Sequence, residues 1–216
     1  MVWVVVVSVF LVICAYLLGS IPTGYLMARQ LAGIDIREHG SGSTGATNVL
    51  RTVGKKAGAT VLLIDALKGS VAVVLVYGCY QFFPGLMMSE SWQSWLVVFN
   101  ALAAVLGHSK SIWLGFTGGK SVATSLGVLL TMNPMVGLGT LGVFLVMLAI
   151  SRIVSLSSIS GALAVSILMI LLAQPLPYIL FGLVAGVYVV VRHRSNIERL
   201  LAGKEPKVGQ KLEEQT

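Results

Sequence analysis

Glycine-rich polar stretches interrupt an otherwise apolar chain at two places. The first covers residues 40–48, with the sequence GSGSTGATN, and is followed by Arg51. The second covers residues 118–121, with the sequence GGKS, and forms one polar cluster with the preceding residues 108–110, HSK. Small residues in tight loops expose successive backbone N–H groups that form anion sites. Both loops also lead into segments expected to be helical, whose first N–H groups favour phosphate. Arginine and lysine would add charge-assisted hydrogen bonds. The two loops therefore predict sites for two phosphate groups or for one shared phosphate.

Two more polar clusters follow later in the chain. Residues 152–158 contain an arginine and three serines, and residues 193–199 have the sequence HRSNIER. Because four such clusters interrupt one apolar chain, we expect them to form one composite site. The competing interpretation of the glycines, as turns and as small residues in helix packing, is preferred only for Gly182 and Gly186, which lie inside an apolar segment.

The second glycine-rich loop lacks the pattern of a nucleotide-binding P-loop. That motif requires glycine five residues before Gly119, where the chain has Leu114. A metal site is not indicated either, because the His, Cys, Asp and Glu residues show no metal-ligand spacing. Cys14 and Cys79 both lie in apolar segments, which argues against a disulfide framework or a thiolate metal site. The polar clusters therefore point to phosphate binding without a metal.

The elements that must position these clusters are membrane helices. Apolar residues make up 56% of the 216-residue chain and charged residues 11%, whereas a typical soluble domain has about 25% charged residues. Seven apolar segments are candidates for helices that cross a membrane, and the short fourth one either crosses or re-enters. The segments are residues 2–27, 57–80, 92–107, 122–132, 135–150, 153–173 and 178–191. We therefore expect an all-α integral membrane protein with about seven transmembrane helices.

The placement of positive charge predicts the topology. The net charge is +7, and fourteen of the fifteen Lys and Arg residues fall in residues 29–56, 107–121, 151–152 and 192–216. Positive charge is enriched in cytoplasmic loops. We therefore expect an outside N-terminus, a cytoplasmic C-terminus and all four polar clusters at the cytoplasmic face. No basic residue precedes the first segment, which argues against a signal peptide. Without a soluble basic domain, nucleic-acid binding is not expected.

One basic residue, Lys68, lies inside an apolar segment. Asp65 stands three residues before it, so the two side chains can pair on one helix, and pairing lowers the cost of charge inside a membrane. We interpret this pair as structural. For the chain as a whole, we expect one membrane domain over residues 1–204 and a polar cytoplasmic tail over residues 205–216.

Three of these clusters resemble the signature motifs of a known family. Residues 40–48 with Arg51, residues 118–124 and residues 193–199 are similar to motifs of the bacterial acyl-phosphate:glycerol-3-phosphate acyltransferases, the PlsY family. The resemblance runs from about residue 18 to residue 204, and the order and spacing of the motifs agree along with the apolar pattern. Three matching motifs on one membrane scaffold make the resemblance specific.

The resemblance implies an enzyme and a reaction. A fatty acyl chain would pass from acyl phosphate to the 1-hydroxyl of sn-glycerol 3-phosphate. The products would be 1-acyl-glycerol 3-phosphate (lysophosphatidic acid) and inorganic phosphate, in the first step of bacterial phospholipid synthesis. The resemblance also implies that the reaction needs neither a cofactor nor a metal. The acyl tail would run between helices into the bilayer. The protein would be a multi-pass protein of the cytoplasmic (inner) membrane. The expected partner is the enzyme that makes acyl phosphate from acyl carrier protein.

The resemblance further implies roles for individual residues. The acyl-phosphate headgroup would be bound by Ser41, Gly42, Gly45, Thr47 and Asn48. Glycerol 3-phosphate would be bound by Arg51, Lys120, Ser155, His193 and Asn196. The positions implied to be catalytic are Ser41, His193 and Asn196. From the residues themselves, we expect His193 to be neutral near pH 7, because its neighbours Arg192 and Arg194 disfavour protonation.

Two mechanisms and one other class of function stay open. Acyl phosphate is already activated, so its own phosphate could accept the hydroxyl proton, and we favour this substrate-assisted route. A covalent acyl-enzyme through Ser41 or Ser43 is the alternative. A transporter or channel for a phosphorylated anion would also use several spans and an anion site. Transporters usually place that site near the midplane, between repeated halves, and this chain shows no internal repeat.

Overall fold

A computed structural model of the chain describes residues 2–210, which form ten α-helices joined by loops and short 3₁₀ turns. No β-strand occurs in this part of the chain. The helices are α1 (Val2–Ser20), α2 (Thr23–Ala32), α3 (Ala46–Thr52), α4 (Lys55–Phe82), α5 (Gln93–Ser109), α6 (Val122–Met132), α7 (Pro134–Ser151), α8 (Val154–Leu171), α9 (Leu176–Arg192) and α10 (Arg194–Leu201).

Each of the seven predicted apolar segments coincides largely with one helix, namely α1 or one of α4 to α9. The fourth of these helices, α6, has 11 residues and is short, as predicted. By length and hydropathy, residues 2–32, α4, α7 and α8 can each cross a membrane. A fifth candidate is α9 together with α10, which meet at a bend of 59°. The all-α architecture with several membrane-spanning helices is therefore confirmed. The number of seven crossings and the orientation of the termini stay predictions.

The first apolar segment breaks at Pro22. Helix α1 ends at Ser20, and α2 begins at Thr23, so the predicted continuous helix to residue 27 is wrong. Proline has no N–H to donate and disfavours the helical conformation of the residue before it, here Ile21. Helix α2 lies against the first glycine-rich loop, because a Cβ at Gly24 would lie 1.8 Å from Thr44 O. A similar turn was expected at residues 133–134, where the side chain of Asn133 accepts from Val136 N at 3.0 Å and starts α7.

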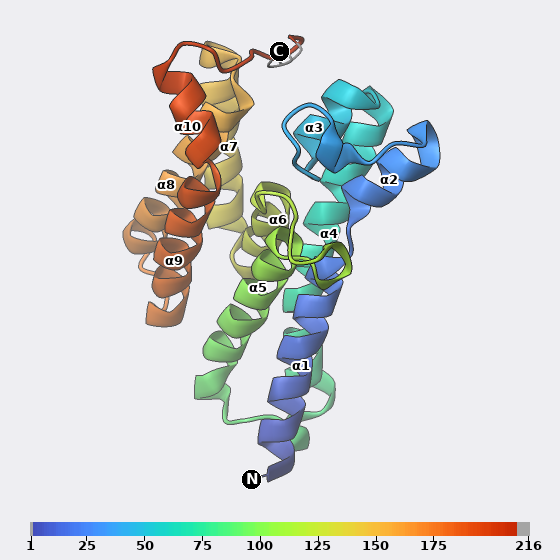
Figure 1. Cartoon of the computed structure of the whole chain (residues 1–216). Coiled ribbons are helices and arrows are strands. Elements are labelled where there is room, and N and C mark those ends of the chain that lie inside the picture. The colour runs from blue at the N-terminus through green and yellow to red at the C-terminus, as the bar shows by residue number, and fades with distance from the viewer. Residues whose placement is uncertain (1, 211–216) are drawn as a thin grey trace.

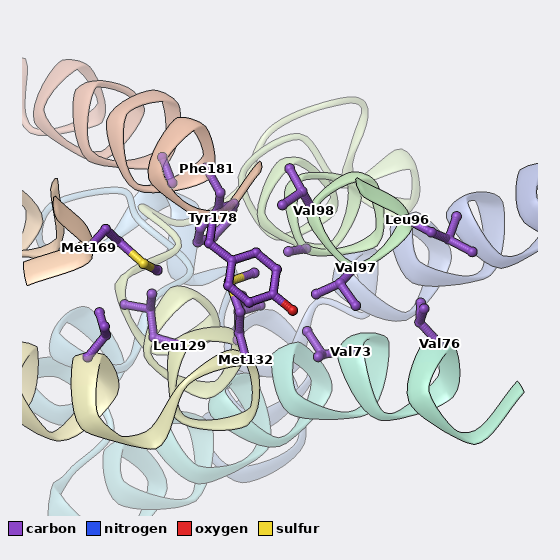
Figure 2. Packing of buried hydrophobic residues seen from close by; sticks show 14 of the residues in the cluster. Val73, Val76, Leu96, Val97, Val98, Leu129, Met132, Met169, Tyr178 and Phe181 are labelled. Atoms are coloured by element: carbon purple, nitrogen blue, oxygen red, sulfur yellow. The ribbon is translucent and has the colours of Figure 1, made fainter. Parts of the chain in front are cut away.

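The helices pack in neighbouring pairs: α1 against α5, α4 against α6, α7 against α8, and α8 against α9. The α8–α9 contact confirms the packing role predicted for Gly186, because a Cβ there would lie 2.8 Å from Ala162 O of α8. The main buried core lies between α4, α5, α6, α8 and α9 and includes Val97, Leu129 and Phe181 (Figure 2). Large apolar side chains also cover much of the outer surface, which suits contact with lipid.

The polar loops gather toward one end of the helix bundle. The start of α1 and the loop between α4 and α5 lie at one end, whereas α2, α3 and α10 lie at the other (Figure 1). The loop between α5 and α6 lies between these groups, beside α4. Segments far apart in the sequence therefore surround one region between α3, α6, α8 and α10.

Candidate active site

The four polar clusters meet around one cavity of about 140 Å³. This confirms that they form a composite site. Nine of the ten predicted site residues line it: Ser41, Gly45, Thr47, Asn48, Arg51, Lys120, Ser155, His193 and Asn196. The tenth, Gly42, lines a neighbouring polar cavity together with Lys110 and Arg192. The residues come from loops and helix ends that are up to about 150 positions apart in the chain.

Asn48 organises the first glycine-rich loop. Its side chain is buried, and its amide N–H groups donate to the carbonyls of His39 and Ser43, both at 2.9 Å. Its Oδ1 accepts from Ser41 N at 3.0 Å. The amide of Asn48 is thus used to fold the loop, and the backbone N–H of Ser41 is not free for an anion. The side chains of Ser41 and Thr47 still line the cavity.

The second glycine-rich loop is also held by internal bonds. Gly119 N donates to His108 O at 3.2 Å, and Arg192 Nη2 donates to Gly119 O at 3.0 Å. The expectation that this loop offers its backbone N–H groups to phosphate is therefore wrong at Gly119. In place of the backbone N–H of Gly119, this loop offers an anion the positively charged side chain of Lys120. The Nζ of Lys120 donates to Asn196 Oδ1.

Glu205 is a site residue that the sequence patterns did not reveal. Its carboxylate is buried in the cavity wall and accepts from Ser155 Oγ at 2.8 Å, Asn196 Nδ2 at 2.6 Å and Arg199 Nε at 2.7 Å. From the sequence, Glu205 was expected in the polar tail of residues 205–216. Residues 211–216 of that tail lie outside the described residues. In the sequence, Glu205 is marked only by its place between Lys204 and Lys207, shortly after the third motif.

The charges around Glu205 and Lys120 set the electrostatics of the cavity. Burial alone would raise the pKa of Glu205, but the bonds from Asn196, Ser155 and Arg199 outweigh it and hold the pKa below its usual value. Burial, together with the positive charge of Arg199, lowers the pKa of Lys120 to about 8. The cavity is lined by two positive side chains, Arg51 and Lys120, and by two carboxylates, Asp65 and Glu205. Lys68 and Arg199, which lie outside the lining, pair with the two carboxylates. Arg51 and Lys120 form no ion pair within the described residues, which favours an anionic ligand beside them.

His193 follows the last residue of α9 and is buried. Burial lowers its pKa to about 4, with smaller contributions from Lys120 and Arg192. The predicted neutral state is supported, although burial rather than the flanking arginines is the main cause. Arg194 points outward and pairs with Glu198. The Nδ1 of His193 lies 2.7 Å from Val189 O, so a neutral ring donates there and keeps Nε2 as an acceptor.

The predicted ion pair between Asp65 and Lys68 is confirmed, with Lys68 Nζ 2.8 Å from Asp65 Oδ1. Both side chains are buried, and Asp65 also lines the cavity, as does His108 from the end of α5. The contact between Asp65 and His108 was not predicted, because the two residues are 43 positions apart in the chain. Within residues 2–210, no group of three His, Cys, Asp or Glu side chains could hold a metal ion.

A larger apolar cavity of about 460 Å³ adjoins the polar one. The two cavities share lining residues, including Thr47, Arg51, Val122 and Val154. The apolar cavity extends between α4, α6, α7, α8 and α9, where it is lined by side chains such as Leu62, Leu126, Leu129, Phe144, Val165 and Phe181. The combined space can take a molecule that has a polar head and a long apolar chain.

Comparison with known proteins gives consistent matches over almost the whole chain. The sequence model of a family described as "Glycerol-3-phosphate acyltransferase" matches residues 9–203. The glycerol-3-phosphate acyltransferase of Nostoc sp. strain PCC 7120 is 66% identical over 211 residues, which cover 95% of this chain and 93% of the relative. The enzyme of the same name from Rippkaea orientalis is 65% identical over 209 residues, which cover 97% of this chain and 96% of the relative.

Two solved structures are also similar to the chain. Both are described as PlsY (YgiH), an integral membrane glycerol 3-phosphate acyltransferase, one in its glycerol 3-phosphate form and one in its lysophosphatidic acid form. The first has a TM-score of 0.84 and 40% sequence identity and covers 94% of this chain and 96% of its own. The second has a TM-score of 0.81 and 39% identity and covers 94% and 95%.

Proposed function

Because the chain belongs to the glycerol-3-phosphate acyltransferase family and is thus an acyltransferase, we propose that it moves a fatty acyl chain from acyl phosphate to the 1-hydroxyl of glycerol 3-phosphate. The products are 1-acyl-glycerol 3-phosphate and inorganic phosphate, and the reaction begins bacterial phospholipid synthesis. The observation that carries this proposal is the joined pair of cavities, one polar and cation-lined and one apolar. The two similar structures of PlsY (YgiH) are described as its glycerol 3-phosphate form and its lysophosphatidic acid form, which correspond to the proposed acceptor and product.

The apolar cavity suits the acyl chain of the donor. Its lining is almost entirely aliphatic and aromatic, so each methylene group moved into it from water gains about 0.8 kcal/mol. The polar cavity then receives the acyl-phosphate headgroup beside Ser41, Gly45, Thr47 and Asn48, whereas Gly42 lines the neighbouring cavity. Because Thr47 lines both cavities, the reacting carbonyl is expected close to this residue.

The phosphate of glycerol 3-phosphate is assigned to the positive side of the cavity. Arg51 and Lys120 supply charge-assisted hydrogen bonds, and Ser155, His193 and Asn196 supply neutral ones. Lys120 and Asn196 already touch each other. Arg51 Nη2 donates to Pro206 O at 3.2 Å and has further N–H groups to offer a phosphate.

The proposed chemistry is substrate-assisted. The 1-hydroxyl oxygen attacks the carbonyl carbon, the bond from that carbon to the phosphate oxygen breaks, and the leaving phosphate takes the hydroxyl proton. No covalent acyl-enzyme forms. The protein brings the two substrates together and stabilises the developing negative charge. Neutral His193 fits a positioning role, because its low pKa makes it a weak base.

The cellular setting follows from the same proposal. The protein is a multi-pass protein of the cytoplasmic membrane, with an outside N-terminus and the cavity at the cytoplasmic face, where glycerol 3-phosphate is dissolved. Residues 1–204 form one membrane domain, and the segment that follows contributes Glu205 to the cavity wall. An enzyme that makes acyl phosphate from acyl carrier protein supplies the donor, and no metal or cofactor takes part.

The purified protein in detergent tests the choice of donor and the class of function. We expect it to acylate glycerol 3-phosphate with palmitoyl phosphate but not with palmitoyl-CoA. Activity with palmitoyl-CoA alone would overturn the proposed donor. In sealed vesicles, uptake of glycerol 3-phosphate without acylation would favour the transporter or channel instead.

A further inference from the structure

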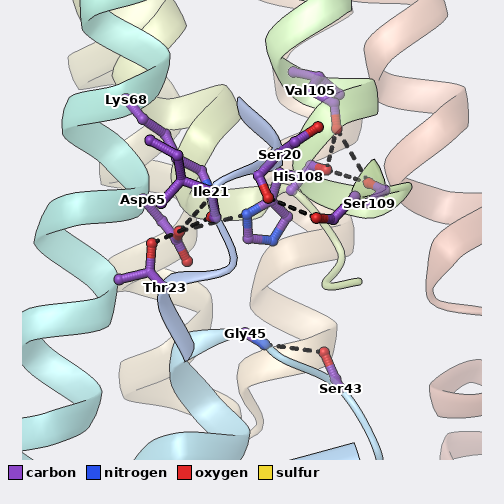
Figure 3. A network of polar contacts seen from close by, with 12 residues as sticks. Ser20, Ile21, Thr23, Ser43, Gly45, Asp65, Lys68, Val105, His108 and Ser109 are labelled. Atoms are coloured by element: carbon purple, nitrogen blue, oxygen red, sulfur yellow. Dashed lines mark hydrogen bonds and ion pairs between the residues drawn. The ribbon is translucent and has the colours of Figure 1, made fainter. Parts of the chain in front are cut away.

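A chain of buried polar groups lies under the second glycine-rich loop, and the proposed chemistry does not use it. Lys68 Nζ contacts Asp65 Oδ1 at 2.8 Å and donates to Ile21 O at 2.9 Å (Figure 3). His108 Nδ1 lies 3.5 Å from the same Asp65 oxygen. These groups come from the end of α1, from α4 and from α5, and the three side chains are each less than 9% exposed. Polar groups buried inside a membrane protein are expensive and often serve function.

The carboxylate of Asp65 faces the Nδ1 edge of the His108 ring at 3.5 Å without forming a hydrogen bond in this arrangement. A carboxylate only accepts hydrogen bonds, so the nitrogen that faces it is the one expected to carry the proton. This places the proton of a neutral His108 on Nδ1 and leaves the opposite edge, with Nε2, directed away from Asp65. Figure 3 shows the ring between Asp65 and the end of α5.

That opposite edge meets the glycine-rich loop directly. A Cβ at Gly119 would lie only 2.2 Å from His108 Nε2, and a Cβ at Gly118 would lie 2.3 Å from His108 O. Gly119 N also donates to His108 O at 3.2 Å. The loop therefore rests on both the backbone and the imidazole of His108, and the two glycines are required for this close contact.

The next residue along the loop is Lys120, whose ammonium reaches Asn196 in the cavity. We propose that Asp65 and His108 are positioning residues: Asp65 fixes the imidazole, the imidazole supports Gly119, and this support sets where the Lys120 ammonium stands toward the acceptor phosphate. The inference rests on the proposed function of the cavity. Lys68 compensates the charge of Asp65, which is a role separate from the positioning.

The test compares His108→Ala, His108→Asn, Gly119→Ala and the double variant His108→Ala/Gly119→Ala in detergent. We expect His108→Ala to raise KM for glycerol 3-phosphate about tenfold, because small displacements of a binding group are costly. Both kcat and KM for acyl phosphate should change less than about threefold, since the reacting groups are untouched. His108→Asn, whose amide can still donate toward Asp65, should give an intermediate KM.

The Gly119→Ala variant tests the contact itself. Its methyl group collides with the imidazole, so it should also raise KM for glycerol 3-phosphate. In the double variant the ring is gone, and KM should be no higher than in His108→Ala, because residues in contact have non-additive effects. Gly78→Ala is the control, since a Cβ at Gly78 in α4 meets open space, and it should leave KM unchanged.

Several results would overturn the inference. Additive effects of His108→Ala and Gly119→Ala would show that the contact does not position the loop. A fall in kcat at constant KM would place His108 among the reacting groups. If His108→Asn were no better than His108→Ala, Asp65 would have no part in positioning. Should His108→Ala fail to fold, His108→Asn combined with Gly119→Ala answers the same question. A wild-type protein inactive with acyl phosphate and glycerol 3-phosphate would instead refute the proposed function.

Discussion

If Lys120 binds the acceptor as proposed, we expect KM for glycerol 3-phosphate to depend on pH by an amount that follows from the pKa of Lys120. Burial lowers its pKa to about 8, so the ammonium is the main form at pH 7 and the neutral amine at pH 9. The protonated fraction then falls from about nine-tenths at pH 7 to about one-tenth at pH 9 for a group with this pKa. If only the ammonium binds the phosphate, KM for glycerol 3-phosphate should rise about tenfold over that range.

The substrate and the other cavity groups do not produce this rise. A phosphate monoester has its second pKa near 6 and is a dianion throughout the range. His193, with a pKa of about 4, is neutral throughout. The assay is the initial rate against glycerol 3-phosphate concentration at several pH values from 6.5 to 9.5.

A matched variant separates Lys120 from every other titrating group. Lys120→Arg keeps a positive charge that is not lost below pH 12, so its KM should stay nearly level between pH 7 and pH 9, whatever its absolute value. A flat KM in the wild-type protein would refute the reasoning. An equal rise in Lys120→Arg would refute it as well, because the titrating group would then be elsewhere.

Three further predictions concern single residues, and a fourth concerns topology. His193→Asn or His193→Gln should keep measurable activity with an unchanged pH–rate profile above pH 5; two folded but inactive variants would make His193 the general base. Arg51→Ala should lower kcat/KM at least about tenfold, because one charge-assisted bond contributes about 1.5–3 kcal/mol; wild-type kinetics would remove Arg51 from the site. Glu205→Ala should lower the unfolding temperature in detergent, since it leaves the buried donors of Ser155 and Asn196 and the half-buried donor of Arg199 without an acceptor, whereas Ala at exposed Glu198 should not; equal unfolding temperatures would contradict the buried network. A cysteine replacing Ser43 should resist an impermeant reagent added to intact cells, and ready labelling would refute the cytoplasmic site.

Hydropathy and charge were enough to predict the helices and the meeting of the polar clusters. Apolar segments long enough to bury their backbone in lipid must form helices, and the seven predicted segments did so. The break before α2 was missed, because the segment around Pro22 is apolar overall. Mean hydropathy does not show that proline lacks the backbone N–H that a helix interior needs. The glycine-rich loops were correctly placed at one cavity.

The detailed roles of loop residues were harder to predict, because they depend on contacts between distant segments. Asn48 has the side chain of a ligand-binding residue, yet its amide closes its own loop. Asp65 was paired correctly with Lys68 at helical spacing, but its contact with His108 requires α4 and α5 to be adjacent. Glu205 enters the site only because the chain turns back after α10. Spacing along the sequence carries no signal for such contacts.

A single-turnover experiment with enzyme in excess over palmitoyl phosphate tests the central claim most directly. Inorganic phosphate and 1-palmitoyl-glycerol 3-phosphate are measured at the same time points, with and without glycerol 3-phosphate. We expect both products to appear at one rate and in equal amounts, and no phosphate to form without the acceptor. A burst of phosphate before the acylated product, or phosphate release without glycerol 3-phosphate, would contradict direct transfer from acyl phosphate and indicate an acyl-enzyme.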